Sequence, residues 1–328
     1  MRAWLRPIIV PAALMSLMAS LLPSVAQEFP TRPITLVVPL SAGGAMDIVA
    51  RRIADKMSER LGQPVVVENR VGGGTVVAAA SVAKAAPDGY TIMFTPSATL
   101  TTNLAVYKSL PYDPKHDFSL IALTSQVGFV LVVNPSLQVH NVTELVAAAK
   151  AKPGQLFYGS PGNATMPHLA GEMLKRESGA PITHVPYRGS VPALNDVVAG
   201  HTQMTFTDPA ISAPLIQAGK LQALGVSSRV RVTALPDVPP LAEAGLPNFE
   251  AVSWHMIIAP AGLPQPIAEK LHVTIKNILA LPEIKSAIVT IGLIPLDTPD
   301  RAELQRFLNA EIPRWNGLVQ ELGLAGSQ

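Results

Sequence analysis

The sequence predicts an α/β fold divided into two lobes, and three observations support this prediction. Short apolar runs typical of β-strands alternate with helical patterns almost throughout the chain. The 31 Pro and 23 Gly are scattered rather than clustered, which indicates many short loops. The strand–helix series also occurs twice, beginning near Ile34 and again near Phe129. Repeated strand–helix units predict mainly parallel sheets with helices on both faces.

The first series is predicted to hold three strands and two helices. A helix over 46–61 follows the first strand, because apolar residues recur along it at helical spacing and Gly62 ends it. An alanine-rich helix follows the glycines at 72–74 and ends before Pro87. The strands are expected at 34–39, 65–68 and 91–95.

The second series is predicted to hold five strands and four helices. Asn141 with Glu144 three residues later resembles a capping box and predicts a helix start. The strands are expected at 129–134, 156–160, 182–187, 203–207 and 221–226. The helices are expected at 141–152, 166–178 and 191–199, and after Asp208-Pro209.

The last hundred residues are predicted to contain one strand and three helices. The strand covers 249–260, and the helices cover 265–280, 282–291 and 299–322. The pattern places lobe boundaries near 125–130 and 225–230. This divides the chain into 27–127, 128–227 and 228–328.

The first 26 residues have the pattern of a secretory signal peptide. Arg2 and Arg6 form a basic start, an apolar run covers 8–22, and Ser24-Val25-Ala26 is a small-x-small cleavage signal. The run is shorter than the ~20 residues needed to span a bilayer, which argues against a membrane anchor. Export to the periplasm is therefore expected, with a mature chain that starts near Gln27.

The composition excludes several classes of function. Without Arg2 and Arg6, the 25 Lys and Arg become 23, against 23 Asp and Glu. A nearly neutral mature chain lacks the basic stripe that nucleic-acid binding requires. The chain has no Cys, so neither disulfides nor cysteine zinc sites are available. We expect an apolar core to stabilise it.

The first candidate site is the loop 41–47, which connects an apolar strand to a helix. Its small residues would let a ligand approach the backbone closely, and the helix start would offer free N–H groups to an anion. Asp47 is expected to cap or brace the helix, since a carboxylate repels an anionic ligand. The competing interpretation is a tight turn that binds no ligand.

The second candidate site is the loop 159–165, which has the same position in the other lobe. Ser160, Asn163 and Thr165 could form hydrogen bonds there. Ligands of α/β sheets lie outside the carboxyl ends of the strands, where such loops occur. The competing interpretation is an ordinary Pro/Gly loop.

Other motifs are weaker or point away from catalysis. His168 and Glu172 share a helix face, but no third metal ligand is apparent, so no metal is expected. Nucleotide-binding glycine motifs and a GxSxG elbow are also missing. Arg188 is expected on an exposed loop. Trp254 is interpreted either as a pocket wall or as a core residue, and His255 as a structural residue.

Several motifs together resemble one family, the Bug receptors, which are solute-binding proteins of tripartite tricarboxylate transporters. The resemblance runs nearly end to end from Phe29. The motifs are Val38-Pro39 with Ala42-Gly43-Gly44-Ala45-Met46-Asp47, Val67-Glu68-Asn69-Arg70, Pro87-Asp88-Gly89-Tyr90, His168-Leu169-Ala170-Gly171-Glu172, Val185-Pro186-Tyr187-Arg188-Gly189, and Trp254 with Ala259-Pro260-Ala261-Gly262. Each is weak alone, but their order and spacing make the resemblance strong.

The resemblance implies a type II periplasmic binding protein-like fold with a hinged cleft between two lobes. It also implies that 228–328 returns to the first lobe, and that a monomer binds a small organic acid and delivers it to membrane permease subunits. No cofactor is implied. The residues expected at the site are Ser41, Gly43, Gly44, Ala45, Asp47, Ser97, Ala98, Tyr158, Ser160, Gly162, Asn163, Ala164, Thr165, His168, Tyr187, Gly189, Ser190, Asp208 and Trp254.

Two other functions remain compatible with the sequence. A periplasmic hydrolase or transferase could use an α/β scaffold, because fold alone does not set function. A nucleophile paired with a base would favour that hypothesis, and none stands out. A ligand sensor acting through a signalling partner is not distinguished from a transport receptor.

Overall fold

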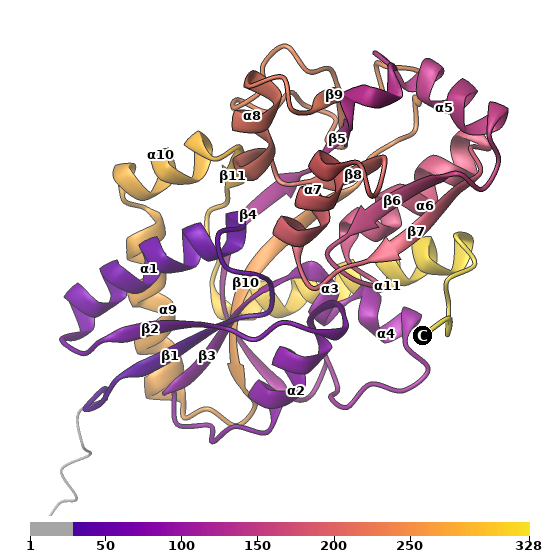
Figure 1. Cartoon of the computed structure of the whole chain (residues 1–328). Helices are drawn as coiled ribbons and strands as arrows, with labels where there is room; N and C mark the ends of the chain where they lie inside the picture. The colour runs from indigo at the N-terminus through magenta and orange to yellow at the C-terminus, as the bar shows by residue number, and fades with distance from the viewer. Residues whose placement is uncertain (1–28) are drawn as a thin grey trace, which may run out of the picture.

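The computed structural model describes residues 29–328, which form two α/β lobes side by side (Figure 1). The predicted signal peptide lies outside the described residues. Each lobe is built on one mixed sheet with helices on both faces. The predicted fold class is therefore confirmed.

The first lobe contains a six-stranded sheet in the order β11-β4-β10-β3-β1-β2. Its strands are β1 (Ile34–Val38), β2 (Val65–Asn69), β3 (Thr91–Pro96), β4 (Phe118–Gly128), β10 (Val252–Pro260) and β11 (Leu293–Pro295). The central strands are buried on both faces, as their continuous apolar runs predict. Adjacent residues of β1 show this, since Leu36 and Val37 point to opposite faces and belong to different apolar clusters.

Helices cover both faces of this sheet. One face packs against α1 (Ala45–Leu61), α9 (Gln265–Leu279) and α10 (Pro282–Thr290). The other face packs against α2 (Val76–Ala83), α3 (Ser97–Leu100), α4 (Thr102–Val106) and α11 (Arg301–Glu321). The end of α11 reaches the second lobe, where Glu321 forms an ion pair with Arg176 (Figure 1).

The second lobe contains a five-stranded sheet in the order β7-β6-β8-β5-β9. Its strands are β5 (Val130–Val133), β6 (Leu156–Ser160), β7 (Ile182–Pro186), β8 (Met204–Thr207) and β9 (Gln222–Val226). Its helices are α5 (Val142–Ala151), α6 (Met166–Ser178), α7 (Ser190–Ala199) and α8 (Pro209–Gln217). The predicted capping box is present, because Asn141 Oδ1 accepts from Glu144 N at 2.9 Å.

The prediction of mainly parallel sheets is wrong. Strands β4, β5 and β10 carry the chain through the region between the lobes, and each pairs antiparallel with its neighbours. Only the β1–β2, β1–β3, β6–β7 and β6–β8 pairs of the described residues are parallel. The strand β4 was also not predicted, because its second half contains the polar residues Thr124, Ser125 and Gln126.

The chain segments that cross between the lobes are hydrogen-bonded to one another. β4 continues into β5 through Phe129, whose N–H donates to Ser227 Oγ at 2.8 Å and whose carbonyl accepts from Ser227 N at 2.7 Å. Ser227 in turn accepts a hydrogen bond from Ala251 N at 2.9 Å. The two crossings, near Phe129 and Ala251, are thus both hydrogen-bonded to Ser227, and such a narrow connection permits hinge motion.

The chain re-enters the first sheet only at β10. Before that point, Val232 and Leu235 pack in an apolar cluster with Val130 of the second sheet, and Val226 forms a bridge with Pro240. We therefore place the second crossing near Ala251, later than the sequence-based boundary at 227. In the part of the chain that the structure describes, no helix has the length and apolarity needed to cross a bilayer.

Candidate ligand-binding site

A cavity lies between the two lobes, where loops that follow strands of both sheets meet. The space in it that a water-sized sphere can occupy is small, about 30 Å³. The described residues that line it include no Lys or Arg, and its ionisable residues are Asp208 and His255. The lining residues are Leu40, Met46, Pro96, Ala98, Phe129, Pro161, Thr165, Met166, Pro167, Ser190, Asp208, Ser253 and His255.

Four helices begin at this cavity. Met46 lies in the first turn of α1, Met166 begins α6, Ser190 begins α7, and Asp208 directly precedes α8. The first N–H groups of a helix have no acceptor within it, and each N-terminus carries about half a positive charge. The helix starts therefore offer the cavity backbone donors and a positive potential that do not depend on cationic side chains, which favours an anionic group.

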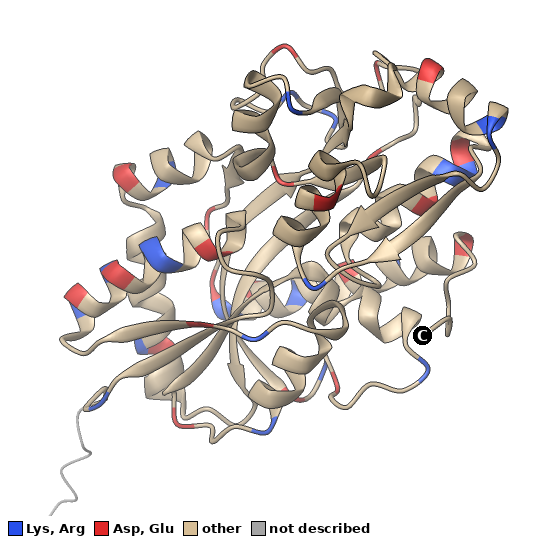
Figure 2. Ribbon diagram, in the orientation of Figure 1, with Lys and Arg blue, Asp and Glu red and all other residues tan. Residues whose placement is uncertain are grey.

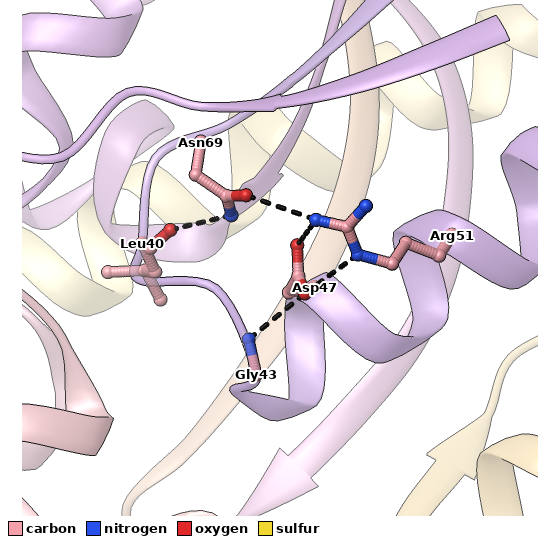
Figure 3. A network of polar contacts seen from close by, with 5 residues as sticks. All are labelled: Leu40, Gly43, Asp47, Arg51 and Asn69. Atoms are coloured by element: carbon pink, nitrogen blue, oxygen red, sulfur yellow. Dashed lines mark hydrogen bonds and ion pairs between the residues drawn. The ribbon is translucent and has the colours of Figure 1, made fainter.

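A polar network holds the loop between β1 and α1 in place (Figure 3). Asp47 accepts hydrogen bonds from Gly43 N at 3.0 Å and from two nitrogens of Arg51 at 2.9 and 3.0 Å. Asn69 accepts from Arg51 at 3.4 Å and donates to the Leu40 carbonyl at 3.0 Å. The sequence-based expectation that Asp47 braces the loop agrees with this geometry.

The electrostatics of Asp47 follow from the same contacts. Burial alone would raise its carboxyl pKa, but the hydrogen bonds from Arg51 and Gly43 outweigh burial and lower that pKa below its usual range. The Gly43 N–H is therefore already occupied, and Gly43 itself is exposed. The N–H groups of residues 45–47 have no acceptor within the helix, because the first helical bond runs from Ile48 N to Gly44 O.

A second network supports the loop between β6 and α6. Ser160 Oγ accepts from Gly162 N at 3.2 Å and lies 2.6 Å from His184 Nε2. Thr165 Oγ1 donates to Gly162 O at 2.6 Å. The Ala164 N–H donates to His168 Nδ1 at 3.2 Å, so this donor is not free for a ligand.

The ring of His168 stacks on that of His184, with 4.0 Å between the centroids. Burial lowers the pKa of His168 to about 4 and that of His184 to about 3, so both rings are neutral at pH 7. Tyr158 lies beside them and donates to Glu172 at 2.7 Å. Tyr158, Ser160 and His168, predicted as ligand contacts, thus support the loop from beneath and do not line the cavity.

Alternation along β10 decides which side chains face the cavity. Ser253 and His255 point into it, whereas Trp254 lies on the opposite face, donating to Glu311 at 2.7 Å and packing against Phe307. The Ser253 hydroxyl lies 2.9 Å from that of Ser97. The structure therefore places His255 in the cavity wall and Trp254 in the core.

The remaining predicted residues surround the cavity at different depths. Ala98, Thr165, Ser190 and Asp208 line it directly. The Ser41 hydroxyl is buried without a hydrogen-bond partner among the described residues. Most of the other predicted residues lie in the loops and helix starts described above. The edges where the lobes face each other hold Tyr187, Gly189 and Asn163.

Sequence reasoning missed most of the cavity wall. The structure adds Leu40, Met46, Pro96, Phe129, Pro161, Met166, Pro167, Ser253 and His255. Most of these directly flank a predicted loop or helix start, so extending each candidate loop by a residue at both ends would have found them. Phe129 and Ser253 lie in the crossing region, which gives no local signal.

Glycines bring the two lobes into direct contact. A Cβ on Gly74 would overlap the carbonyl oxygen of Asn163, and a Cβ on Gly189 would overlap the Ser41 hydroxyl. Thr102 Oγ1 also donates across the gap to Ala164 O at 2.6 Å. The lobes are therefore closed over the cavity, and the first lobe contributes its triple-glycine loop to the closure.

Most charged side chains of the described residues lie outside the cavity. Lys, Arg, Asp and Glu are scattered over the outer helices and loops (Figure 2). Arg188 lies exposed on the loop before α7. Among residues 29–328, no group of three His, Asp or Glu side chains is placed to hold a metal ion.

Comparison with known proteins decides the family. The model for the tripartite tricarboxylate transporter family receptor, TctC, matches residues 49–324. The chain belongs to this family. BugT of Bordetella pertussis is 36% identical over 303 residues, which cover 92% of each chain.

Solved structures of family receptors have the same fold. Rpa4515 of R. palustris, solved with adipate, is 37% identical with a TM-score of 0.87, and the match covers 91% of this chain and 99% of that one. MatC of Rhodopseudomonas palustris, solved with bound malate, is 30% identical with a TM-score of 0.83, covering 89% and 100%. The resemblance to Bug receptors inferred from sequence motifs is thus confirmed.

Proposed function

We propose that this protein is an exported receptor that captures a small organic acid between its lobes and delivers it to a tripartite tricarboxylate-type permease. The observation that carries the proposal is the closed cavity, where four helices begin and which no Lys or Arg of residues 29–328 lines. Two receptors of the same family hold adipate and malate, which supports a carboxylate ligand.

Neutral donors hold the carboxylate in this proposal. The first turns of α1 and α6 supply backbone N–H groups near Met46 and Met166, and the Ser41 hydroxyl, which has no partner among the described residues, lies close to α1 in sequence. A helix N-terminus contributes only about half a charge, so affinity comes from directed hydrogen bonds in a dry site. Binding is then selective for the geometry of the acid.

Hinge closure links capture to delivery. Both lobes contribute walls to the cavity, so a ligand gains its full set of contacts only when the lobes are closed. The ligand therefore stabilises the closed state, and the permease would recognise that state. The chain's own residues bind and orient the acid, and no chemical change of the ligand is part of the proposal.

A thermal-shift panel tests the ligand class. We expect mono- or dicarboxylates to raise the melting temperature of the mature protein, while neutral sugars and nucleotides leave it unchanged. An acid at 100 times its Kd adds about 2.7 kcal/mol of stability. A shift with a sugar and none with any acid would reject the proposal, and recovery of chemically altered acid would indicate an enzyme instead.

A further inference from the structure

One carboxylate of the described chain faces the cavity, and no cationic side chain of that part of the chain lies there to balance it. Asp208 lies at the start of α8, is only 8% exposed, and lines the cavity. Its side chain does not cap its own helix, whereas its backbone carbonyl accepts from Ser212 N at 3.2 Å. Ser190 lines the same cavity, and its side chain lowers the pKa of the Asp208 carboxyl.

The other ionisable residue of the cavity wall does not neutralise Asp208. His255 Nδ1 lies 3.0 Å from Ser125 Oγ, and burial lowers the pKa of this histidine to about 3. His255 is therefore uncharged at neutral pH. Burial raises the pKa of Asp208 to about 6, so its carboxylate is still mostly ionised at pH 7.5.

A buried carboxylate that no cationic side chain accompanies restricts what the cavity can bind. A ligand with two carboxylates would add two negative charges to a site that already holds one, and no cationic side chain of residues 29–328 lines it. A ligand that supplies its own positive charge avoids this repulsion. It would also give Asp208 the charged hydrogen-bond donor that the cavity wall does not provide.

We propose that the cavity selects an organic acid that also carries an ammonium group. The acid's carboxylate lies at the N-termini of α1 and α6, and its ammonium group donates to Asp208 and to the hydroxyl of Ser190. The inference rests on the proposed receptor function and adds the second polar group of the ligand. It predicts a preference different from that suggested by the adipate and malate of the solved relatives.

Matched ligands test the preference by isothermal titration of the mature protein. One set is butyrate, succinate, γ-aminobutyrate and α-aminobutyrate, and a longer set is caproate, adipate, ε-aminocaproate and norleucine. In the set that binds best, we expect an amino acid to bind at least about tenfold more tightly than either acid without an amine. Equal or tighter binding of the dicarboxylate would overturn the inference and leave the receptor function standing.

The variant Asp208→Asn removes the negative charge of this side chain and keeps its size, so it tests whether the charge determines ligand preference. We expect it to weaken binding of the amino acid by about 30-fold and to leave dicarboxylate binding unchanged or stronger. Asp237→Asn is the matched control, since Asp237 is exposed on a loop, and it should change neither affinity. An unchanged ratio in Asp208→Asn would overturn the inference.

Dependence on pH gives a readout that needs no variant. As pH falls from about 7.5 to about 5, Asp208 becomes protonated while His255 stays neutral, so amino-acid binding should weaken and dicarboxylate binding should strengthen. If the affinities for the amino acid and for the dicarboxylate changed in the same direction with pH, the inference would be contradicted. If neither kind of acid binds at any pH, the receptor proposal fails together with it.

Discussion

Replacing Gly74 by alanine is expected to lower the affinity for the captured acid by about 100-fold or more. The new Cβ would overlap the backbone oxygen of Asn163, which belongs to the other lobe. Backbone atoms on both sides leave no flexible side chain to move aside. The variant would therefore fold, but its lobes would close incompletely. Because only the closed state binds the acid fully, the apparent Kd rises as the population of the closed state falls.

The control must separate closure from backbone strain. Gly74 has φ of 57°, so alanine there is also strained locally by roughly 1 kcal/mol. Gly154 has φ of 76°, and a Cβ added to it would meet nothing within 4 Å, so Gly154→Ala carries similar strain away from the lobe contact. Isothermal titration of both variants should show the loss only in Gly74→Ala. Equal affinities would mean that this contact is not needed for binding.

The second large effect is expected in the core of the first lobe. Glu311 is buried on α11, and its Oε2 accepts from the indole nitrogens of Trp254 and Trp315, each at 2.7 Å. The variant Glu311→Ala would leave two buried N–H groups unpaired and remove a charged acceptor. We expect a loss of about 3 kcal/mol in the free energy of unfolding, measured by urea denaturation.

Two further variants make this test specific. Glu311→Gln keeps one acceptor oxygen, so its loss should be about 1 kcal/mol. Glu321→Ala removes an exposed carboxylate from the end of the same helix and should cost at most about 0.5 kcal/mol. A Glu311→Ala protein as stable as the Glu321→Ala protein would show that the two indole contacts do not stabilise the fold.

The local pattern of the sequence predicted most elements of the fold, because strand and helix periods are local properties. The direction of strand pairing is not local. β5 pairs antiparallel with β8 and β9 because the chain enters the second lobe from the opposite side to the strands of that lobe's own series. No residue pattern within β5 encodes that direction.

The missed strand β4 shows a related limit. Its polar residues look like a loop, yet Thr124 Oγ1 donates to His255 O at 3.1 Å and the Ser125 hydroxyl pairs with the His255 ring. The partners lie 131 and 130 residues away in the chain. Only the tertiary fold satisfies these buried groups, so a single sequence gives no sign that they are buried.

The sequence predicted the parts of the candidate site that lie in loops directly after strands. It did not predict the parts in which the pairing register of a strand determines which side chain faces the cavity. The two loops were found because short Gly-rich segments between a strand and a helix are typical of anion sites. Whether His255 or Trp254 faces the cavity depends on the register of β10 against β3 and β4, where His255 lies opposite Pro96 and Ser125. A shift of one residue would exchange their positions.

The central claim is that the lobes close over an organic acid, and a distance between spin labels tests it directly. The native chain has no Cys, so Asp55→Cys on α1 and Lys220→Cys after α8 would carry the only labels. Both positions are exposed, and α1 and α8 face each other across the lobes. We predict that double electron–electron resonance will show a shorter distance between the two labels once a binding acid is added than without it. In a labelled Gly74→Ala protein, we predict that the longer distance will persist after the acid is added. An acid that binds tightly while the distance distribution stays unchanged would contradict capture by closure.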